Sequence, residues 1–201
     1  MLRILALYFL TTLLCHPVWA YKIQYAEQWY KLYHLHMDRM PDDELENLVY
    51  LEEALKAPFA NPLYALARIQ NKTDWEYYRY LFKMHVNLQI VRTYRQMGVK
   101  YDRRFVYFFN APWKEQNLES LEIAEKFYRR AIYFWHQALE WVEKANDKRF
   151  RWIELTEVAF WKNELRQINQ KEVDFEKILN KDLKKLEANR KLFEAMDKNT
   201  Y

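Results

Sequence analysis

The chain of 201 residues contains a single glycine, Gly98. Glycine normally supplies about 7% of residues, because hairpin turns and phosphate-binding loops need backbone angles that other residues adopt only at a cost. A protein made of strands joined by tight turns needs more glycine than this chain contains. The sequence instead carries 18% Phe, Trp and Tyr, whose large rings suit the space between helices. These two features predict an all-α protein with an aromatic core.

Apolar residues recur at steps of three and four, which is the spacing of one helix face. We expect about six helices that stack as antiparallel hairpins in a solenoid or bundle. Thr73 and Glu76 form a predicted capping box, and Gly98 is the predicted left-handed residue that ends the same helix. The expected helices span 21–40, 43–57, 62–70, 74–97, 117–145 and a long C-terminal helix over 149–196.

The expected helix over 117–145 has alanine at every seventh position from Ala124 to Ala145. Small residues let a neighbouring backbone approach closely, and large rings between them fill the space on either side. We therefore expect this row to face another helix at the centre of the protein. The predicted central residues are Trp75, Leu81, Phe82, Ala124, Tyr128, Ala131, Trp135 and Ala138.

The first twenty residues have the three parts of a secretory signal peptide. Met1–Arg3 is a short basic start, 4–14 is apolar apart from two threonines, and Ala20 ends a Val-Trp-Ala sequence suited to signal peptidase. We expect cleavage before Tyr21, which places the protein outside the cytoplasm, in a bacterial periplasm.

Cleavage at this point would leave one helical domain over 21–201, in which 170–201 either projects as a charged helix or folds back on the core. It would also remove Cys15, the only cysteine, so no disulfide or cysteine metal ligand is expected. Two alternatives stay open. An uncleaved membrane anchor would have a short apolar run, and a lipoprotein would need a small residue before Cys15, where the chain has leucine.

Two overlapping segments, Ala124-x3-Tyr128-x2-Ala131 and Ala131-x3-Trp135-x2-Ala138, resemble the second helix of a tetratricopeptide repeat. Trp152-x2-Leu155 resembles the start of a first helix, although no proline closes the period of about 34 residues. The resemblance implies a helical-hairpin scaffold for protein interactions. The whole chain is similar to the small exported helical proteins of spirochaetes, a group that includes the periplasmic collar around the flagellar motor.

No catalytic, metal or cofactor site is predicted. His34 and His36 are two positions apart, so they point to different sides of a helix and cannot share a metal ion there. His85 lies on an apolar stripe, where we expect a buried histidine with its hydrogen bonds satisfied. Ser120 lies in the first turns of a helix without a nearby histidine, so it lacks the general base that a nucleophilic serine needs.

Charge is separated along the chain. The segment 38–53 holds seven acidic residues and one arginine, whereas 79–104 holds seven basic residues and one aspartate. Arginine beside aromatic rings is enriched at protein interfaces, so the basic segment is the predicted partner-binding surface. In the alternative, its arginines neutralise the acidic helix and act as an internal brace. The candidate partner-binding residues are Arg92, Arg95, Arg103, Arg104, Tyr107 and Phe108.

These features predict a non-enzymatic periplasmic scaffold or adaptor that binds other exported or membrane-anchored proteins, as part of a hetero-oligomeric envelope or flagellar motor assembly. The formal net charge of +4 is mild for a nucleic-acid binder, and no nucleic-acid partner is expected. The chain has no further strong membrane-insertion signal after the signal peptide. The alternative is a carrier that holds a lipid or other apolar ligand in an aromatic-lined cavity, and a third class is an envelope enzyme without local motifs.

Overall fold

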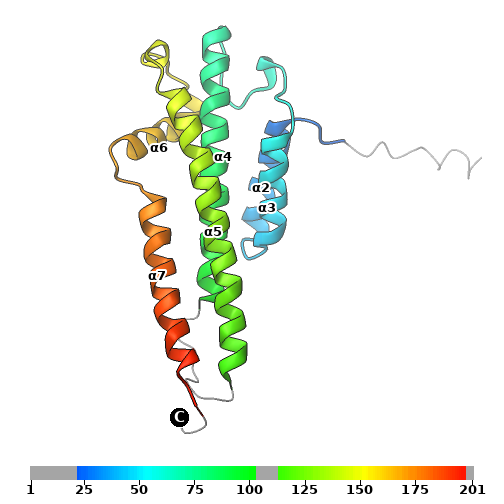
Figure 1. The fold of residues 1–201 in the computed structure, drawn as a ribbon. Helices are drawn as coiled ribbons and strands as arrows, with labels where there is room; N and C mark the ends of the chain where they lie inside the picture. Colours follow the sequence, from blue (N-terminus) through cyan, green and yellow to red (C-terminus); the bar gives the residue numbers. More distant parts are fainter. Residues whose placement is uncertain (1–21, 103–112, 198–201) are drawn as a thin grey trace, which may run out of the picture.

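The computed structural model describes residues 22–102 and 113–197, and all the regular structure in these ranges is helical (Figure 1). The predicted signal peptide and its cleavage site lie outside the described residues. The described part confirms the all-α prediction and contains six α-helices, which are α2 (Ala26–Arg39), α3 (Glu44–Lys56), α4 (Lys72–Tyr101), α5 (Lys114–Ala145), α6 (Ala159–Asn169) and α7 (Phe175–Glu194). Short 3-10 turns are η1 (Pro62–Tyr64), η3 (Lys148–Phe150) and η4 (Thr156–Val158).

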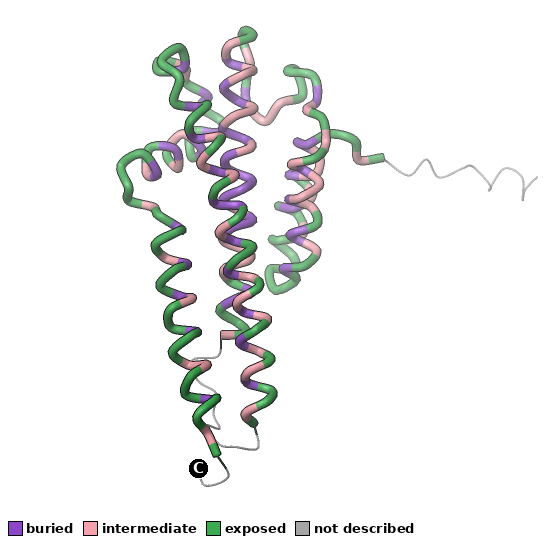
Figure 2. The backbone as a smooth tube through the Cα atoms, viewed as in Figure 1, coloured by how far each residue is buried: buried purple, intermediate pink, exposed green. Residues whose placement is uncertain are grey.

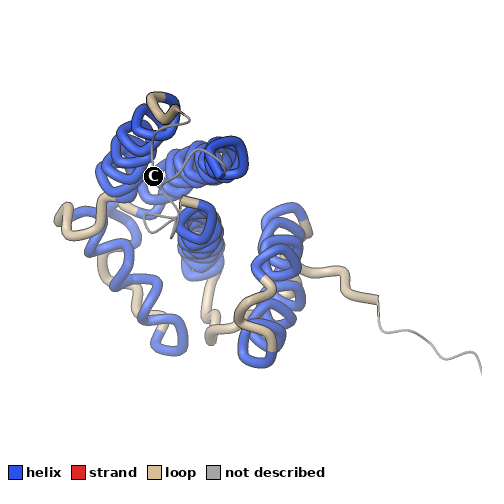
Figure 3. Tube along the Cα trace, turned by 90° about the horizontal axis from the view of Figure 1, so that it is seen from below, coloured by secondary structure: helices blue, strands red, loops and turns tan. Residues whose placement is uncertain are grey.

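The long antiparallel hairpin of α4 and α5 forms the spine of the molecule (Figure 1). The α2–α3 hairpin packs on one flank of α4, while α7 lies along α5 and α6 packs across the other side of α4, as the view along the bundle shows (Figure 3). None of the described helices is long and apolar enough to cross a membrane. The result is a set of stacked helices with α4 at its centre.

The buried residues follow the inward sides of α4 and α5 (Figure 2). Ala124, Ala131 and Ala138 are fully buried and Ala145 nearly so, which confirms that the alanine row faces a neighbouring helix. The other predicted central residues are buried too, except that Trp75 is half-buried and stacks on Tyr78 with ring centroids 5.3 Å apart. The hydrophobic periodicity therefore identified the packed faces correctly.

The prediction for Gly98 is wrong. The residue lies inside α4, which continues to Tyr101, and no glycine among the described residues has a positive φ. A Cβ on Gly98 would stand 2.7 Å from Cδ1 and 3.0 Å from Cζ of Tyr128 on α5. Glycine is needed here because a ring of the facing helix occupies the place of a side chain.

The predicted cap of α4 is wrong, and the helix expected over 62–70 begins at Pro62 as predicted but ends after one turn. The side chain of Asn71, and not that of Thr73, caps α4 by accepting hydrogen bonds from the backbone N–H groups of Thr73 and Asp74 at 2.8 and 2.9 Å. The expected helix over 62–70 is reduced to the turn η1, where Asn61 accepts from Leu63 N at 3.0 Å. In both places the side-chain oxygen of the asparagine just before the helix accepts hydrogen bonds from the free backbone N–H groups of the first turn.

The long C-terminal helix expected over 149–196 is broken into η3, η4, α6 and α7. Asp147 and Asp174 each cap a new element with their carboxylates, and Lys171 has a φ of 57° after the end of α6. The chain therefore turns back so that α7 lies along α5. Its heptad-spaced apolar residues are buried in that contact, namely Phe175, Leu179, Leu186 and Phe193.

Candidate functional site

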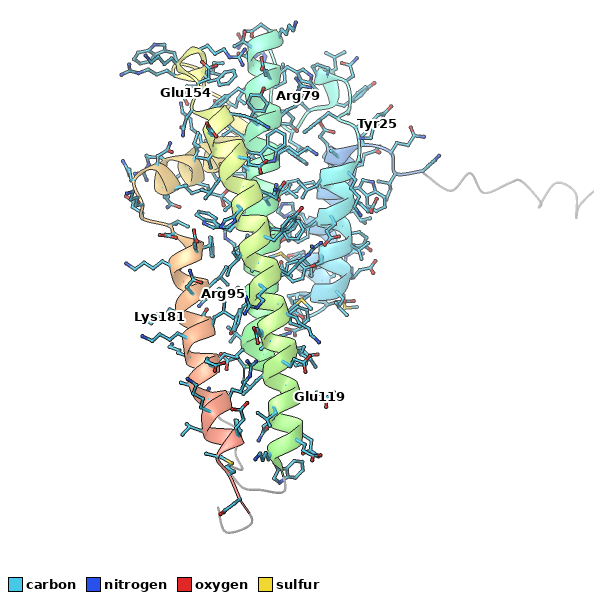
Figure 4. The ribbon with its side chains drawn as sticks, viewed as in Figure 1. Tyr25, Arg79, Arg95, Glu119, Glu154 and Lys181 are labelled. Carbon is cyan, nitrogen blue, oxygen red and sulfur yellow. The ribbon has the colours of Figure 1, made fainter. Side chains whose placement is uncertain are left out.

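The two described members of the predicted partner-binding set make internal ion pairs. Arg92 donates to Glu164 Oε1 of α6 at 2.7 Å, and Arg95 donates through Nε to Asp182 Oδ2 of α7 at 2.9 Å. Figure 4 shows Arg95 on the side of the spine that faces α7. Both arginines remain about 39% exposed at the side chain. Their partners lie on α6 and α7, so these two residues act as braces between helices.

The other four candidate residues, Arg103, Arg104, Tyr107 and Phe108, lie outside the described residues. The acidic segment 38–53 faces α4, as the internal-brace alternative predicted, but the basic partner is a lysine and not one of the arginines. Lys100 pairs with Glu44 and lies 4.0 Å from Asp42. The charge separation along the sequence thus stabilises the contact between α3 and α4.

A buried polar cluster is centred on His85 of α4, which is 1% exposed. Its Nε2 lies 2.7 Å from the Tyr30 hydroxyl of α2, and its Nδ1 lies 2.6 Å from Glu164 Oε2 of α6. The imidazole stacks on Trp161 with centroids 5.3 Å apart, and Phe160 meets it edge-on at 5.1 Å. The prediction of a buried, satisfied histidine is confirmed.

Protonation in this cluster follows from burial. Burial lowers the pKa of His85 despite the neighbouring Glu164 carboxylate, so the ring is neutral near pH 7. Because Glu164 can only accept, Nδ1–H donates to it and Nε2 accepts from the Tyr30 O–H. Burial raises the pKa of Glu164, but the hydrogen bond from His85 and the nearby Arg92 guanidinium outweigh burial and hold that pKa below its usual value.

A tyrosine, a histidine and a carboxylate in series resemble an acid–base relay. Here, however, both imidazole nitrogens are engaged, and the rings of Trp161 and Phe160 cover the histidine. A substrate would have to displace Tyr30 or one of these rings to reach a ring nitrogen. The arrangement instead ties α2, α4 and α6 together. No sequence signal pointed to Glu164 as a partner, because 79 residues separate it from His85.

Large apolar side chains are exposed at the end of the molecule where α4 begins. Leu63 and Tyr64 of η1 are 87% and 72% exposed, and Trp152, between η3 and η4, is 82% exposed. Both loops lie at this same end (Figure 1). Arg151 lies over the Trp152 ring at 4.9 Å and adds a positive charge to the exposed ring. We call Leu63, Tyr64 and Trp152 the apolar end; the two loops lie on either side of the start of α4 (Figure 1), and large exposed apolar side chains are candidate contact points.

An open pocket of about 620 Å³ lies beside this end, between η3 and α6. Its apolar wall includes the stacked rings of Tyr77 and Phe150, whose centroids are 5.0 Å apart. Its polar wall includes Lys162 and Arg166, which hydrogen-bond to neighbours within the chain. The described residues contain no group of three or more His, Cys, Asp or Glu side chains placed to hold a metal ion.

These features define an aromatic-packed helical bundle whose described polar clusters serve mainly to hold helices together. A family model described as a domain of unknown function (DUF8513) matches residues 73–196, from the first turn of α4 to just beyond α7. The match covers more than half of the chain, which therefore belongs to this family. The α2–α3 hairpin, which contributes Tyr30 to the His85 cluster, lies before the matched range. No curated protein and no solved structure shows a significant match.

Proposed function

We propose that this protein is a non-enzymatic scaffold or adaptor of the bacterial periplasm that binds other exported or membrane-anchored proteins. The observation that carries the proposal is the apolar end, where three large side chains are 72% to 87% exposed on two loops of a rigid bundle. Trp and Tyr are the residues most enriched in the energetic centres of interfaces. The assembly suggested by the sequence resemblance is a hetero-oligomeric envelope structure such as a flagellar motor collar.

The polar side chains of the buried cluster bond to neighbouring helices, which supports a binding role over catalysis. His85, Glu164, Arg92 and Arg95 have side chains of types that also occur in active sites, and each is engaged with another helix. Their contacts join α2, α6 and α7 to α4. A rigid bundle presents exposed loops with little loss of entropy on binding.

A carrier for a lipid or other apolar ligand is the second candidate, because the pocket of about 620 Å³ lies within the usual size range of small-molecule sites, about 300–1,000 Å³. Against it stands the packing of the aromatic rings. Tyr78, Phe82 and Trp161 are fully buried and contact one another at centroid distances of 5.6 to 6.2 Å. They fill the core and do not line this pocket.

Affinity purification of the cross-linked full chain from its native envelope tests the proposal. The variant Leu63→Ser with Trp152→Ser should lose recovery of a specific protein at least tenfold while its melting temperature stays the same, because both side chains are exposed. The matched control is Leu192→Ser, which removes a side chain 57% exposed on α7, near the opposite end. Equal recovery from all three proteins, or a co-purified lipid with no protein, would contradict the scaffold proposal.

A further inference from the structure

A hollow of about 270 Å³ lies between α3 and α5 over the middle of α4. It is separate from the apolar end and from the predicted partner-binding residues. Its polar lining includes Asn87 and Lys83 from α4 and Arg130 from α5, and its aromatic lining includes Tyr133 and Trp141. We call it the α3–α5 groove.

Asn87 holds an unused acceptor in this groove. The residue is 2% exposed, and its Nδ2 donates to the Lys83 carbonyl at 2.7 Å. Its Oδ1 is buried and has no hydrogen-bond partner among the described residues. Buried polar atoms are almost always paired, so an unpaired acceptor in the wall of a hollow marks a place where a bound group can supply the donor. The Asn87 side chain thus points to a ligand with an N–H or O–H group.

Arg130, whose guanidinium also interacts with the Tyr94 hydroxyl, supplies a positive charge at the rim. Its guanidinium lies 5.1 Å from the ring centroid of Tyr133 and 4.9 Å from that of Phe134. In the described part of the chain, no carboxylate lies within ion-pair distance of it, whereas the adjacent Arg129 pairs with Glu125 at 2.6 Å. A planar cation held on aromatic rings is well placed to bind a carboxylate.

Lys83 adds a second positive charge deeper in the groove. Its ammonium donates to the Leu55 carbonyl in the last turn of α3, and it lies 5.5 Å from the Phe59 ring centroid. No carboxylate of the described residues forms an ion pair with it either. Glu52, the acidic residue of the lining, accepts a hydrogen bond from the Tyr94 hydroxyl at 3.2 Å. The groove therefore carries an excess of positive charge.

We propose that the α3–α5 groove binds an acidic segment of a partner protein, with a Glu or Asp carboxylate on Arg130 and a backbone N–H on Asn87 Oδ1. An apolar side chain of the segment packs against Tyr133 and Trp141. The hollow of about 270 Å³ is smaller than most complete small-molecule sites, which suits a few side chains of a longer chain. This inference rests on the proposed function only in taking the partner to be a protein.

The test uses the full chain and two blocked peptides, Ac-Phe-Glu-Leu-NH2 and its Gln counterpart, titrated by amide NMR. The Glu peptide should give saturable shifts at the groove, and the Gln peptide should bind at least tenfold more weakly. Arg130→Gln should weaken binding of the Glu peptide tenfold. The matched control Arg129→Gln, one position along the same helix, should leave it unchanged.

Asn87→Leu separates binding from folding. It removes the unsatisfied oxygen and keeps the branched shape of the side chain, so the melting temperature should hold or rise while the Glu peptide binds at least tenfold more weakly. Functional polar groups commonly lower stability in this way. A lower melting temperature with unchanged peptide affinity would show that Asn87 is structural and would overturn its assignment as a ligand.

Four results would overturn the groove assignment. The first is equal binding of the two peptides, and the second is a loss of Glu-peptide affinity in Arg129→Gln as large as in Arg130→Gln. The third is that inorganic phosphate alone gives the same shifts. The fourth is a dimer that Arg130→Gln abolishes, which would make the occupant a second copy of the chain. If the full chain recovers an envelope protein but Arg130→Gln recovers it equally, the groove inference fails and the proposed function stands. If the Glu peptide binds but no envelope protein is recovered, the proposed function fails alone.

Discussion

Replacing Gly98 with alanine tests the contact between the two spine helices. In an exposed helix this substitution stabilises a protein by about 1 kcal/mol, because alanine has the higher helix propensity. Here we expect the opposite sign. The added Cβ would stand 2.7 Å from Cδ1 of Tyr128 and 3.0 Å from its Cζ, whereas carbon atoms in contact prefer about 3.5–4.0 Å.

The Tyr128 ring has little freedom to move away. It is 1% exposed, and its hydroxyl donates to Asp102 Oδ2 at 3.3 Å. Overpacking of this kind costs about 1–3 kcal/mol. After subtracting the gain in helix propensity, we expect a net loss of about 1 kcal/mol in the free energy of unfolding. For a domain of this size the melting temperature should fall by about 2–4 °C.

The assay is urea unfolding of four proteins: the unchanged chain, Gly98→Ala, Tyr128→Ala and the double variant. Tyr128→Ala is itself destabilising because it leaves a cavity, but it removes the clash. In that background Gly98→Ala should become stabilising by about 1 kcal/mol, so the sign of the effect reverses. The coupling energy between the two positions should be about 1–3 kcal/mol. A Gly98→Ala variant that is more stable than the unchanged chain would refute a close approach of α4 and α5 at this point.

Three further predictions can be checked independently. Ala131→Leu should lower the free energy of unfolding by about 1–3 kcal/mol in a urea titration, because Ala131 is fully buried against a helix; Tyr133→Leu, at a position 51% exposed, is its control. The loss in free energy of unfolding caused by His85→Gln should shrink as the pH falls. Burial lowers the pKa of His85, so below about pH 6.5 the unfolded chain takes up a proton that the folded chain resists. The loss should decrease by about 1 kcal/mol between pH 7 and 5.5, and a loss that does not change with pH would refute a neutral His85. N-terminal sequencing of the native protein should begin at Tyr21, and retention of Met1 would contradict export by signal cleavage.

Local sequence patterns were reliable where a side chain acts within one helix or one turn. Asp43 caps α3 by accepting from Glu46 N at 3.2 Å, as expected of an acidic residue before a helix. The alanine row and His85 were assigned to the buried side because periodicity of 3.6 residues defines a face. The end of α5 at Ala145 was predicted, but the same patterns could not place the break after Asn169, where Asp174 caps a new helix.

The sequence by itself determined the all-α class, the approximate ranges of α2 to α5 and which faces of α4 and α5 are buried, since these follow from residue type and spacing within one helix. Only the tertiary structure decided the partners of Arg92 and Arg95, which lie 72 and 87 residues away, and the role of Gly98. Only the packing of α3, α4 and α5 buries the Asn87 Oδ1 atom without a hydrogen-bond donor. The physical reason is that periodicity reports that a face is buried but not what buries it, because side chains pair across helices according to packing geometry and not to their distance along the chain.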